Sequence, residues 1–334
     1  MNSIDLVTGG AGLLGLALGR KLAESGRRVR LFDIREPESP PPGAEVVTGD
    51  IRDPADVDRA VAGAERVFHL ATLMHVGKIR PKMVRDVNIG GLKNVMRAAE
   101  RHGVGRIVFS STIELYGTAP ADPCTEDSPK DPPPGYPAHK WESENLLLEF
   151  SGRTGIPVGF TRMPMILGPG FYHFKMILSF FDALRAGLSI PLLDGGRKKG
   201  RMVALDDAVQ GLMLVGEREE AIGEAFNICC AEVWTHRGLI EEVIERVGSR
   251  SRVVSVPSSL IIPGFKLASA LGLSPVAPEH FYFALNDCNY VIDKAVELLG
   301  YKPTKTSAEA MAETHEHYLD NRRKLKKKKV KIKR

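Results

Sequence analysis

The sequence predicts an α/β fold in which a doubly wound parallel sheet is followed by a smaller C-terminal α/β region. Three observations predict this fold. Apolar runs alternate with segments of helical period over the first 165 residues, and such alternation implies right-handed βαβ crossovers. The runs are apolar throughout, as strands buried on both faces are. A chain of 334 residues is long enough for one such domain and a smaller partner.

The expected elements of the sheet domain alternate in a regular order. A strand at 4–8 leads into a helix at 13–25, which Gly26 closes, and a second strand covers 29–33. After the Pro-rich loop 37–43 come a strand at 44–47 and a helix at 53–62, where Pro54 suits the first turn. Strands at 66–70, 106–110 and 157–161 then alternate with helices at 84–102 and 136–151.

Beyond residue 162 the pattern becomes less regular. Strands at 203–205 and 225–228 enclose a helix at 207–215, and helices at 234–247 and 308–319 follow. We expect a sheet domain over 1–165, to which 203–230 return, then a smaller substrate-binding region over 166–320 and a basic tail over 321–334.

The net charge of +5 hides a strong asymmetry. Residues 322–334 contain ten Lys or Arg and no acid, so the rest of the chain holds 36 basic and 41 acidic residues. Such a run is typical of a disordered, solvated tail. The alternative is weak contact with an anionic membrane surface. We do not expect nucleic-acid binding, because the remaining chain contains no nucleic-acid module.

The four cysteines form no C-x-x-C pair, and they are expected to be free thiols in a reducing compartment: Cys124, Cys229, Cys230 and Cys288. No apolar run approaches the roughly 20 residues of a membrane span, and no signal peptide is expected. These features predict a cytoplasmic protein, with peripheral membrane contact as the alternative. We expect no metal site, because the His315-x-His317 pair has no further ligand nearby and is typical of a solvated helix end.

A glycine pattern follows the first strand and opens the first helix. Gly9 permits a tight turn, Gly12 allows backbone to approach a pyrophosphate, and Gly15 lets the helix pack closely. This context predicts a Rossmann-type dinucleotide site. Asp33 ends the second strand, where a carboxylate binds ribose hydroxyls and repels a 2′-phosphate. NAD is therefore favoured over NADP, although Arg35 lies close by.

Further candidate cofactor residues lie at the carboxyl ends of the strands, where such sheets bind ligands. Asp50 is positioned to accept from the adenine amino group and Ile51 to cover the ring, while the small Ala71 lets the cofactor pass beside Thr72. We assign four more residues to the same site: Leu13, Leu14, Asn88 and Ser110.

Three residues predict proton transfer at a secondary alcohol or ketone. Lys140 follows Tyr136 by four residues, so the two share a helix face. We expect the lysine ammonium to lower the pKa of the phenol, which then acts as base or acid near neutral pH. Thr112 lies just past the fifth strand, and its hydroxyl is placed to bind the substrate oxygen.

These motifs resemble the extended short-chain dehydrogenases/reductases of the NAD-dependent epimerase/dehydratase family. The resemblance covers about residues 3–320 and rests on TGGAGLLG, GDIRD, FSSTIELYG, YPAHK, RMPMILGPG and LDDAV in family order. It implies that Thr112, Tyr136 and Lys140 form a catalytic triad and that Met163 and Met165 pass beside the nicotinamide. It also implies a homodimer in which the helices near 84–102 and 136–151 form a four-helix bundle.

The reaction and substrate stay open between two enzymatic hypotheses. Dehydratases and decarboxylases of the family often carry S-T-x-E-x-Y-G, which implies that Glu114 acts on a sugar; the alternative is that Glu114 caps or pairs locally. One dehydratase branch of the family has Asp at the position of Ile113, so the isoleucine argues against that branch. Arg201 matches a position where such enzymes hold the phosphate of the substrate, and Lys198 and Lys199 add positive charge beside it. The alternative is that these three residues belong to a surface loop. The first hypothesis is therefore a sugar-nucleotide epimerase or related lyase.

The second hypothesis is a 3β-hydroxysteroid-type dehydrogenase for a hydrophobic secondary alcohol. Met165 stands where nucleotide-sugar enzymes of the family usually carry Asn, and a thioether cannot donate that hydrogen bond. The apolar segment 256–275 resembles lipid-active relatives, although ordinary core packing also explains it. A non-enzymatic NAD-sensing or RNA-binding protein is disfavoured by the intact Thr, Tyr and Lys set.

Overall fold

Seven parallel strands form the main sheet in the order β11-β6-β5-β4-β1-β2-β3. The computed structural model describes residues 3–74, 80–171, 175–270 and 285–332. The strands are β1 (Ile4–Thr8), β2 (Arg28–Asp33), β3 (Glu45–Thr48), β4 (Ala64–His69), β5 (Arg106–Thr112), β6 (Val158–Met163) and β11 (Ala225–Asn227). The chain order reverses between β1 and β4, which is where sheets of this kind bind ligands.

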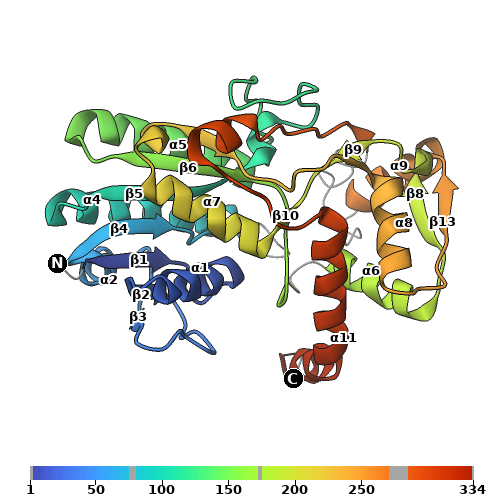
Figure 1. The fold of residues 1–334 in the computed structure, drawn as a ribbon, viewed down its shortest axis with the longest axis horizontal. Helices are drawn as coiled ribbons and strands as arrows, with labels where there is room; N and C mark the ends of the chain where they lie inside the picture. Colours follow the sequence, from blue (N-terminus) through green and yellow to red (C-terminus); the bar gives the residue numbers. More distant parts are fainter. Residues whose placement is uncertain (1–2, 75–79, 172–174, 271–284, 333–334) are drawn as a thin grey trace.

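Helices cover both faces of this sheet (Figure 1). Helices α1 (Leu13–Glu24) and α7 (Leu205–Glu217) pack on one face, in a core that includes Leu18, Phe68 and Leu212. Helices α2 (Pro54–Val61), α4 (Gly91–His102) and α5 (Tyr136–Thr154) pack on the other. The prediction of a doubly wound, Rossmann-type parallel sheet is confirmed.

The helix expected over 84–102 has three parts. A short α3 (Pro81–Arg85) continues into a π-helical turn, Asp86–Gly90, and then into α4. The wider turn is centred on Asn88, whose side chain is 6% exposed and binds the loop after β4. Apolar periodicity predicts a helix there but does not distinguish the π turn from α-helix.

The smaller region has its own core between α6 (Lys175–Ala186), α8 (His236–Arg246) and the last helix, α11 (Ser307–Ile332). Three two-stranded sheets support it: β7 (Ile166–Leu167) with β10 (Val203–Ala204), β8 (Ile190–Leu193) with β13 (Val253–Val256), and β9 (Lys199–Gly200) with β12 (Trp234–Thr235). Thus β10 pairs outside the main sheet, whereas β11 is its seventh strand. Helix α9 (Ser258–Ala270) carries part of the apolar segment, of which 271–275 lie outside the described residues.

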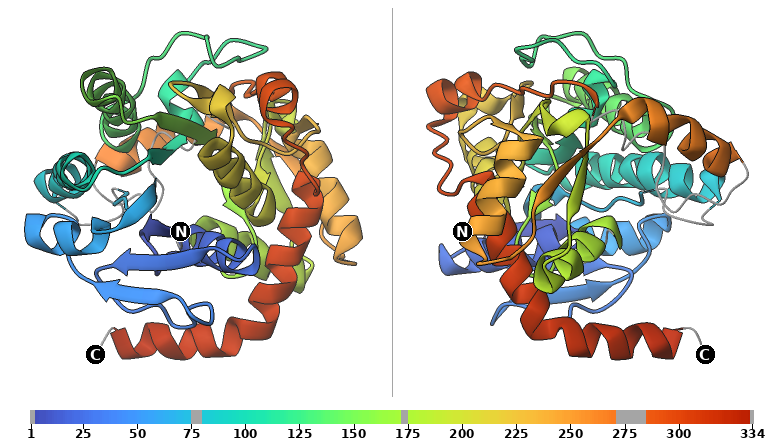
Figure 2. Two further views of the ribbon diagram at one scale, coloured as in Figure 1. Left: turned by 60° about the vertical axis from the view of Figure 1, so that its left-hand side comes forward. Right: turned by 90° about the vertical axis from the view of Figure 1, so that its right-hand side faces the viewer.

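The C-terminal end differs from its prediction. We expected a helix over 308–319 and a disordered tail, but α11 continues to Ile332 and bends before its end (Figure 2). The physical reason is that this stretch contains no Gly or Pro and is rich in Lys and Arg, which are good helix formers. Arg322, counted with the tail, makes an ion pair of 2.7 Å with Asp182 of α6.

The expectation of a solvated His315 is also wrong. His315 is 4% exposed, and its ring lies edge-on to Phe181, with 5.3 Å between centroids, because this face of α11 packs into the smaller core. Within the described part of the chain, no group of His, Cys, Asp and Glu is arranged to hold a metal ion. All four cysteines are buried and free, as predicted. Among the described helices, none is both long and apolar enough to cross a membrane.

Candidate active site

The glycine loop between β1 and α1 forms a cradle of backbone. Gly9 has φ +73°, and a Cβ there would lie 2.9 Å from the Ala71 nitrogen, so only glycine fits this close approach of β1 to β4. A Cβ on Gly15 would lie 2.2 Å from the Gly9 carbonyl oxygen. Gly12 caps α1 without a side-chain hydrogen bond, and the first turn contains no acid. Free N–H groups at a positive helix end suit a pyrophosphate.

Asp33 lies at the end of β2, beside this loop. One carboxylate oxygen accepts from the Ala11 backbone N–H at 3.1 Å, and the other from the Arg35 backbone N–H at 3.3 Å. The side chain is half-buried, and Arg35 is exposed. These two contacts orient the Asp33 carboxylate beside the glycine loop, and its acceptors suit a ribose with free hydroxyls.

The predicted adenine contacts are partly engaged within the protein. Both oxygens of Asp50 accept from the Arg52 guanidinium at 3.0 Å, and this contact lowers the pKa of the Asp50 carboxyl. Ile51 is 8% exposed and packs against Gly91, where any Cβ would meet its side chain at 2.8 Å. Its carbonyl accepts from the Asn94 side chain at 3.0 Å. Ile51 therefore lies between β3 and α4, and the partly exposed Asp50 carboxylate is already paired with Arg52.

The loop after β4 is fixed by Asn88. The Asn88 Oδ1 accepts from the Leu73 backbone N–H at 2.8 Å and from the Thr72 hydroxyl at 3.2 Å, and its Nδ2 donates to the Leu73 carbonyl at 3.0 Å. Asn88 thus holds Ala71 and Thr72 in place beside the glycine loop. Leu13 and Leu14 are both half-buried. Leu14 packs against the core of the main sheet, and Leu13 packs against the core of the smaller region.

Thr112, Glu114 and Tyr136 come together at the carboxyl end of β5. Thr112 caps the short 3-10 turn Ile113–Tyr116, accepting from the Glu114 backbone N–H at 3.3 Å. Thr112 also acts on the phenol of Tyr136, the first residue of α5, in the direction that lowers its pKa. The Glu114 carboxylate is close enough to act on the phenol electrostatically. Three of the predicted catalytic side chains therefore lie close enough together to influence the ionisation of one phenol.

Lys140 completes the group but does not do what was expected of it. Its Nζ donates to the Ser110 carbonyl at 2.6 Å and lies 4.5 Å from the Phe109 ring centroid and 5.6 Å from that of Tyr136. Burial lowers the pKa of Lys140 to about 7. The expected lowering of the Tyr136 pKa is wrong for this structure: burial, and then the Glu114 carboxylate, raise it. Lys140 does not offset them because it is itself desolvated.

Two buried residues beneath this group were missed by sequence reasoning. The Thr8 hydroxyl accepts from the N–H groups of Leu70 and Ala71, each at 3.2 Å, so its own proton points to His69 Nδ1 at 2.8 Å. His69 stacks on Phe109, and burial together with Lys140 lowers its pKa to about 3. His69 is therefore neutral, with its proton assigned to Nε2. The only local signal was a polar pair at the ends of two apolar strands.

The remaining predicted residues lie on the β6 side and in the smaller region. Met163 ends β6, opposite Thr112 in register, and is 3% exposed, while Met165 is half-buried against the smaller core. Arg201 donates to the Cys230 carbonyl at 3.3 Å and to Asn289 at 3.4 Å, and neither contact joins it to Tyr136. Lys198 and Lys199 pair with Asp287 and Asp122, so their charges are neutralised locally.

This fold and this grouping define an NAD-dependent enzyme of the extended short-chain dehydrogenase/reductase type. Residues 6–229 match the NAD dependent epimerase/dehydratase family, and the chain belongs to that family. Its cofactor is NAD, which the glycine cradle and the Asp33 carboxylate fit.

Two of the following relatives cover nearly the whole chain, and the third covers less than half of it. Uncharacterized protein y4nG of Sinorhizobium fredii is 32% identical over 96% of this chain and 80% of its own length. A dTDP-glucose 4,6-dehydratase of Streptomyces antibioticus is 30% identical, covering 95% and 92%. Short-chain dehydrogenase/reductase family 42E member 1 of Mus musculus is 37% identical over 44% of this chain and 40% of its own.

A solved structure shows the same fold. DesIV, a dTDP-glucose 4,6-dehydratase of Streptomyces venezuelae with NAD and TYD bound, is 26% identical to this chain. The match has a TM-score of 0.76 and covers 96% of this chain and 98% of DesIV.

Proposed function

We propose that this enzyme oxidises a secondary hydroxyl of a sugar nucleotide, changes a neighbouring centre and returns the hydride, as an epimerase or related lyase. The observation that carries the proposal is the grouping of Thr112, Glu114 and Tyr136 at the carboxyl end of β5, with the Lys140 Nζ 5.6 Å from the Tyr136 ring centroid. The dTDP-glucose 4,6-dehydratases among the relatives support a nucleotide sugar as the substrate.

The proposal includes a path for the proton between the substrate hydroxyl and Tyr136. Thr112 binds the substrate oxygen and orients it toward Tyr136, which takes the hydroxyl proton on oxidation and returns it on reduction. NAD, when bound, supplies the two-electron acceptor for the hydride. Lys140, held by the Ser110 carbonyl, favours the ionised phenol only while it is itself protonated, and burial lowers its own pKa to about 7.

Glu114 is the group that distinguishes hydride transfer alone from chemistry at a second carbon. Its carboxylate acts electrostatically on Tyr136, which supports a role in accepting or donating a proton at a neighbouring carbon. The neighbouring position 113 carries no second acid, because it is an isoleucine that is 4% exposed and packs into the core. A single carboxylate favours epimerisation or a one-carboxylate lyase over elimination that uses paired acids.

The test is incubation of the purified enzyme with dTDP-glucose and with UDP-glucose, followed by separation of the products. We expect an epimer, or a keto-deoxy sugar formed by loss of water and return of the hydride, without net accumulation of NADH. Tyr136→Phe removes the proton carrier and should reduce turnover at least about 100-fold. Near-normal turnover in this variant would contradict the assignment of Tyr136.

A second candidate is a dehydrogenase for a hydrophobic secondary alcohol. The family 42E relative and the apolar surface of α9, where Leu260 is 73% and Ile261 41% exposed, favour it. Met165, which offers no hydrogen-bond donor, is consistent with it. Net NADH formation with a sterol alcohol, and none with nucleotide sugars, would select this candidate.

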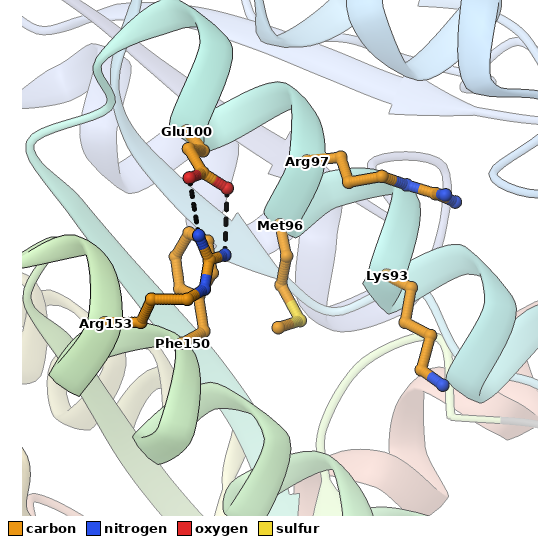
Figure 3. A pocket seen from close by; sticks show the side chains of 6 residues that line it. All are labelled: Lys93, Met96, Arg97, Glu100, Phe150 and Arg153. Atoms are coloured by element: carbon orange, nitrogen blue, oxygen red, sulfur yellow. Dashed lines mark hydrogen bonds and ion pairs between the residues drawn. The ribbon is translucent and has the colours of Figure 1, made fainter.

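We propose a homodimer that pairs α4 and α5 with their copies. A shallow cavity of about 240 Å³ lies between these helices, lined by Lys93, Met96, Arg97, Glu100, Phe150 and Arg153 (Figure 3). Glu100 and Arg153 bridge it with two hydrogen bonds of 2.6 and 2.9 Å. The cavity contains none of the predicted site residues. Its apolar floor and charged rim suit a contact between copies.

We also propose a cytoplasmic enzyme whose basic C-terminal segment makes weak contact with anionic lipid. The support is its charge alone: residues 323–334 carry nine Lys or Arg and no acid. Deleting them, while leaving the Arg322–Asp182 pair intact, should weaken binding to phosphatidylserine vesicles without changing turnover. Equal vesicle binding by both proteins would contradict the proposal.

A further inference from the structure

Glu144 is a buried carboxylate one helical turn beyond Lys140. Both side chains lie on the inner face of α5, where Glu144 is 1% and Lys140 4% exposed. Side chains four residues apart on a helix have Cβ atoms about 5–6 Å apart. Neither the hydride chemistry nor the cofactor site accounts for a carboxylate at this position, which costs solvation energy to bury.

The Glu144 carboxylate is held rigidly from β6. Arg162 Nε donates to Oε1 at 3.1 Å and Nη2 to Oε2 at 2.7 Å, a bidentate pair in which Arg162 is 5% exposed. Arg162 is fixed in turn, because Nη1 donates to the Tyr116 hydroxyl at 3.0 Å and to the Glu126 carbonyl at 2.9 Å. The Tyr116 hydroxyl donates to Asn227 at 2.7 Å. Glu144 is therefore tied to the turn that carries Thr112.

The charges around Lys140 show what this carboxylate does. Tyr136 on the same helix is un-ionised, and His69 from β4 is neutral, so neither offsets the burial of the ammonium. Burial lowers the pKa of Lys140, and Glu144 is the group that raises it. Glu114, on the turn after β5, acts on Tyr136.

The other charged groups packed against α5 act elsewhere. Lys130, from the segment before α5, interacts with Glu144 itself. Arg85, just before the π-helical turn, and Lys93 of α4 act on Glu142 at the outer face of α5. The described surroundings of Lys140 therefore leave Glu144 as its stabilising anion.

We infer that Glu144 is a positioning residue that keeps the Lys140 ammonium charged, and that Arg162 holds its carboxylate for that purpose. The inference rests on the proposed function only in giving Lys140 a part in the reaction. It explains why the buried ion pair lies one helical turn from Lys140: the guanidinium fixes the carboxylate in place beside the ammonium.

The test measures the titration of Lys140 without using activity. Protein labelled with 13C at the lysine ε-carbon is titrated by NMR, and the Lys140 signal is assigned by its loss in Lys140→Met. In Glu144→Gln we expect the titration midpoint to fall by about one pH unit, the order expected for losing a buried charge one helical turn away. Glu144→Asp, which keeps the charge, should stay within about half a unit of the unaltered protein.

Two further variants separate this role from folding. Glu142→Gln lies on the same helix and removes a half-exposed carboxylate paired with Arg85; it should leave the midpoint unchanged. If Glu144→Gln does not fold, because Arg162 is left buried and unpaired, the double variant Glu144→Gln/Arg162→Met should show a smaller fall, since it also removes a cation that opposes the charge on Lys140. An unchanged midpoint in either protein that carries Glu144→Gln would overturn the inference.

A failure of the inference about Glu144 can be distinguished from a failure of the proposed function. If the enzyme turns over, the alkaline limb of its pH profile should move to lower pH in Glu144→Gln by the same interval. If the unaltered protein shows no turnover with nucleotide sugars, the proposed function fails, and the NMR midpoint still decides the role of Glu144.

Discussion

Asp33 accepts a hydrogen bond from the backbone N–H of Ala11 at 3.1 Å, so the end of β2 and the glycine loop after β1 form one unit. The carboxylate is thereby placed beside the N-terminus of α1, where the cofactor's pyrophosphate fits. This contact joins the residue that we propose to select the ribose to the backbone that we propose to bind the phosphates.

Asp33→Ala should weaken NAD binding about 10-fold or more, since hydrogen bonds to a charged group contribute about 1.5–3 kcal/mol. NADP binding should fall much less, because the lost carboxylate also repelled the 2′-phosphate. Calorimetric titration with both nucleotides measures this. Equal losses for NAD and NADP would contradict the ribose assignment.

Gly15→Ala should both destabilise the protein and weaken NAD binding. The new Cβ would lie 2.2 Å from the Gly9 carbonyl oxygen, so the loop must move, and overpacking of this kind costs about 1–3 kcal/mol. Gly152→Ala is the matched control, because Gly152 lies within α5 and a Cβ there meets nothing within 4 Å. It should raise the free energy of unfolding by about 0.5–1 kcal/mol. Urea unfolding of both variants checks the pair.

Lys140→Met should reveal the buried ammonium through the pH dependence of stability. The pKa of Lys140 is about 7 in the folded protein against an ordinary value of 10.5, so the unfolded chain binds more protons between these values. Raising the pH through this window therefore stabilises the unaltered protein, whereas Met does not titrate. The free energy of unfolding of Lys140→Met minus that of the unaltered protein should fall as the pH rises from about 7 to about 10.5.

The control for that prediction is Lys93→Met on the exposed side of α4. The difference in the free energy of unfolding between Lys93→Met and the unaltered protein should stay constant over the same pH range. A constant difference for Lys140→Met as well would mean that the folded protein does not depress the pKa of Lys140.

Leu148→Glu should convert the proposed dimer to a monomer. Leu148 lies on α5 and is 41% exposed, and two charges brought together across a paired helix face repel each other. Leu188→Glu, at a leucine that is 58% exposed beyond α6, should leave the oligomeric state unchanged. Light scattering after gel filtration measures the oligomeric state of both variants. A monomeric unaltered protein would contradict the proposed dimer.

The parts of the fold predicted well from sequence are those specified locally. The strand runs, the glycine loop and the spacing of Tyr136 and Lys140 each depend on neighbours within a few residues, so periodicity and turn chemistry reveal them. The π-helical turn at Asn88 was missed because it depends on the loop after β4. The burial of His315 was missed because Phe181, its partner, is far away in the sequence.

Electrostatics at the site were harder to predict than positions. Four-residue spacing correctly placed Lys140 on the face of Tyr136, but it did not reveal that burial depletes the lysine's charge. Arg162 and Glu144 are 18 residues apart and meet only when β6 lies beside α5. The spacing of Lys140 and Glu144 was the one available signal, and a carboxylate on an inner helix face gave no reason by itself to expect its guanidinium partner.

The most direct test of the account is made on the purified enzyme before any substrate is added. The protein is denatured, and the released nucleotide is identified and quantified by mass spectrometry, with a second sample titrated with added NAD. We predict NAD, either retained at close to one per chain, as a cofactor recycled within each turnover requires, or taken up from solution at one per chain. Empty protein that also fails to bind added NAD would contradict the central claim that the glycine cradle and Asp33 form an NAD site.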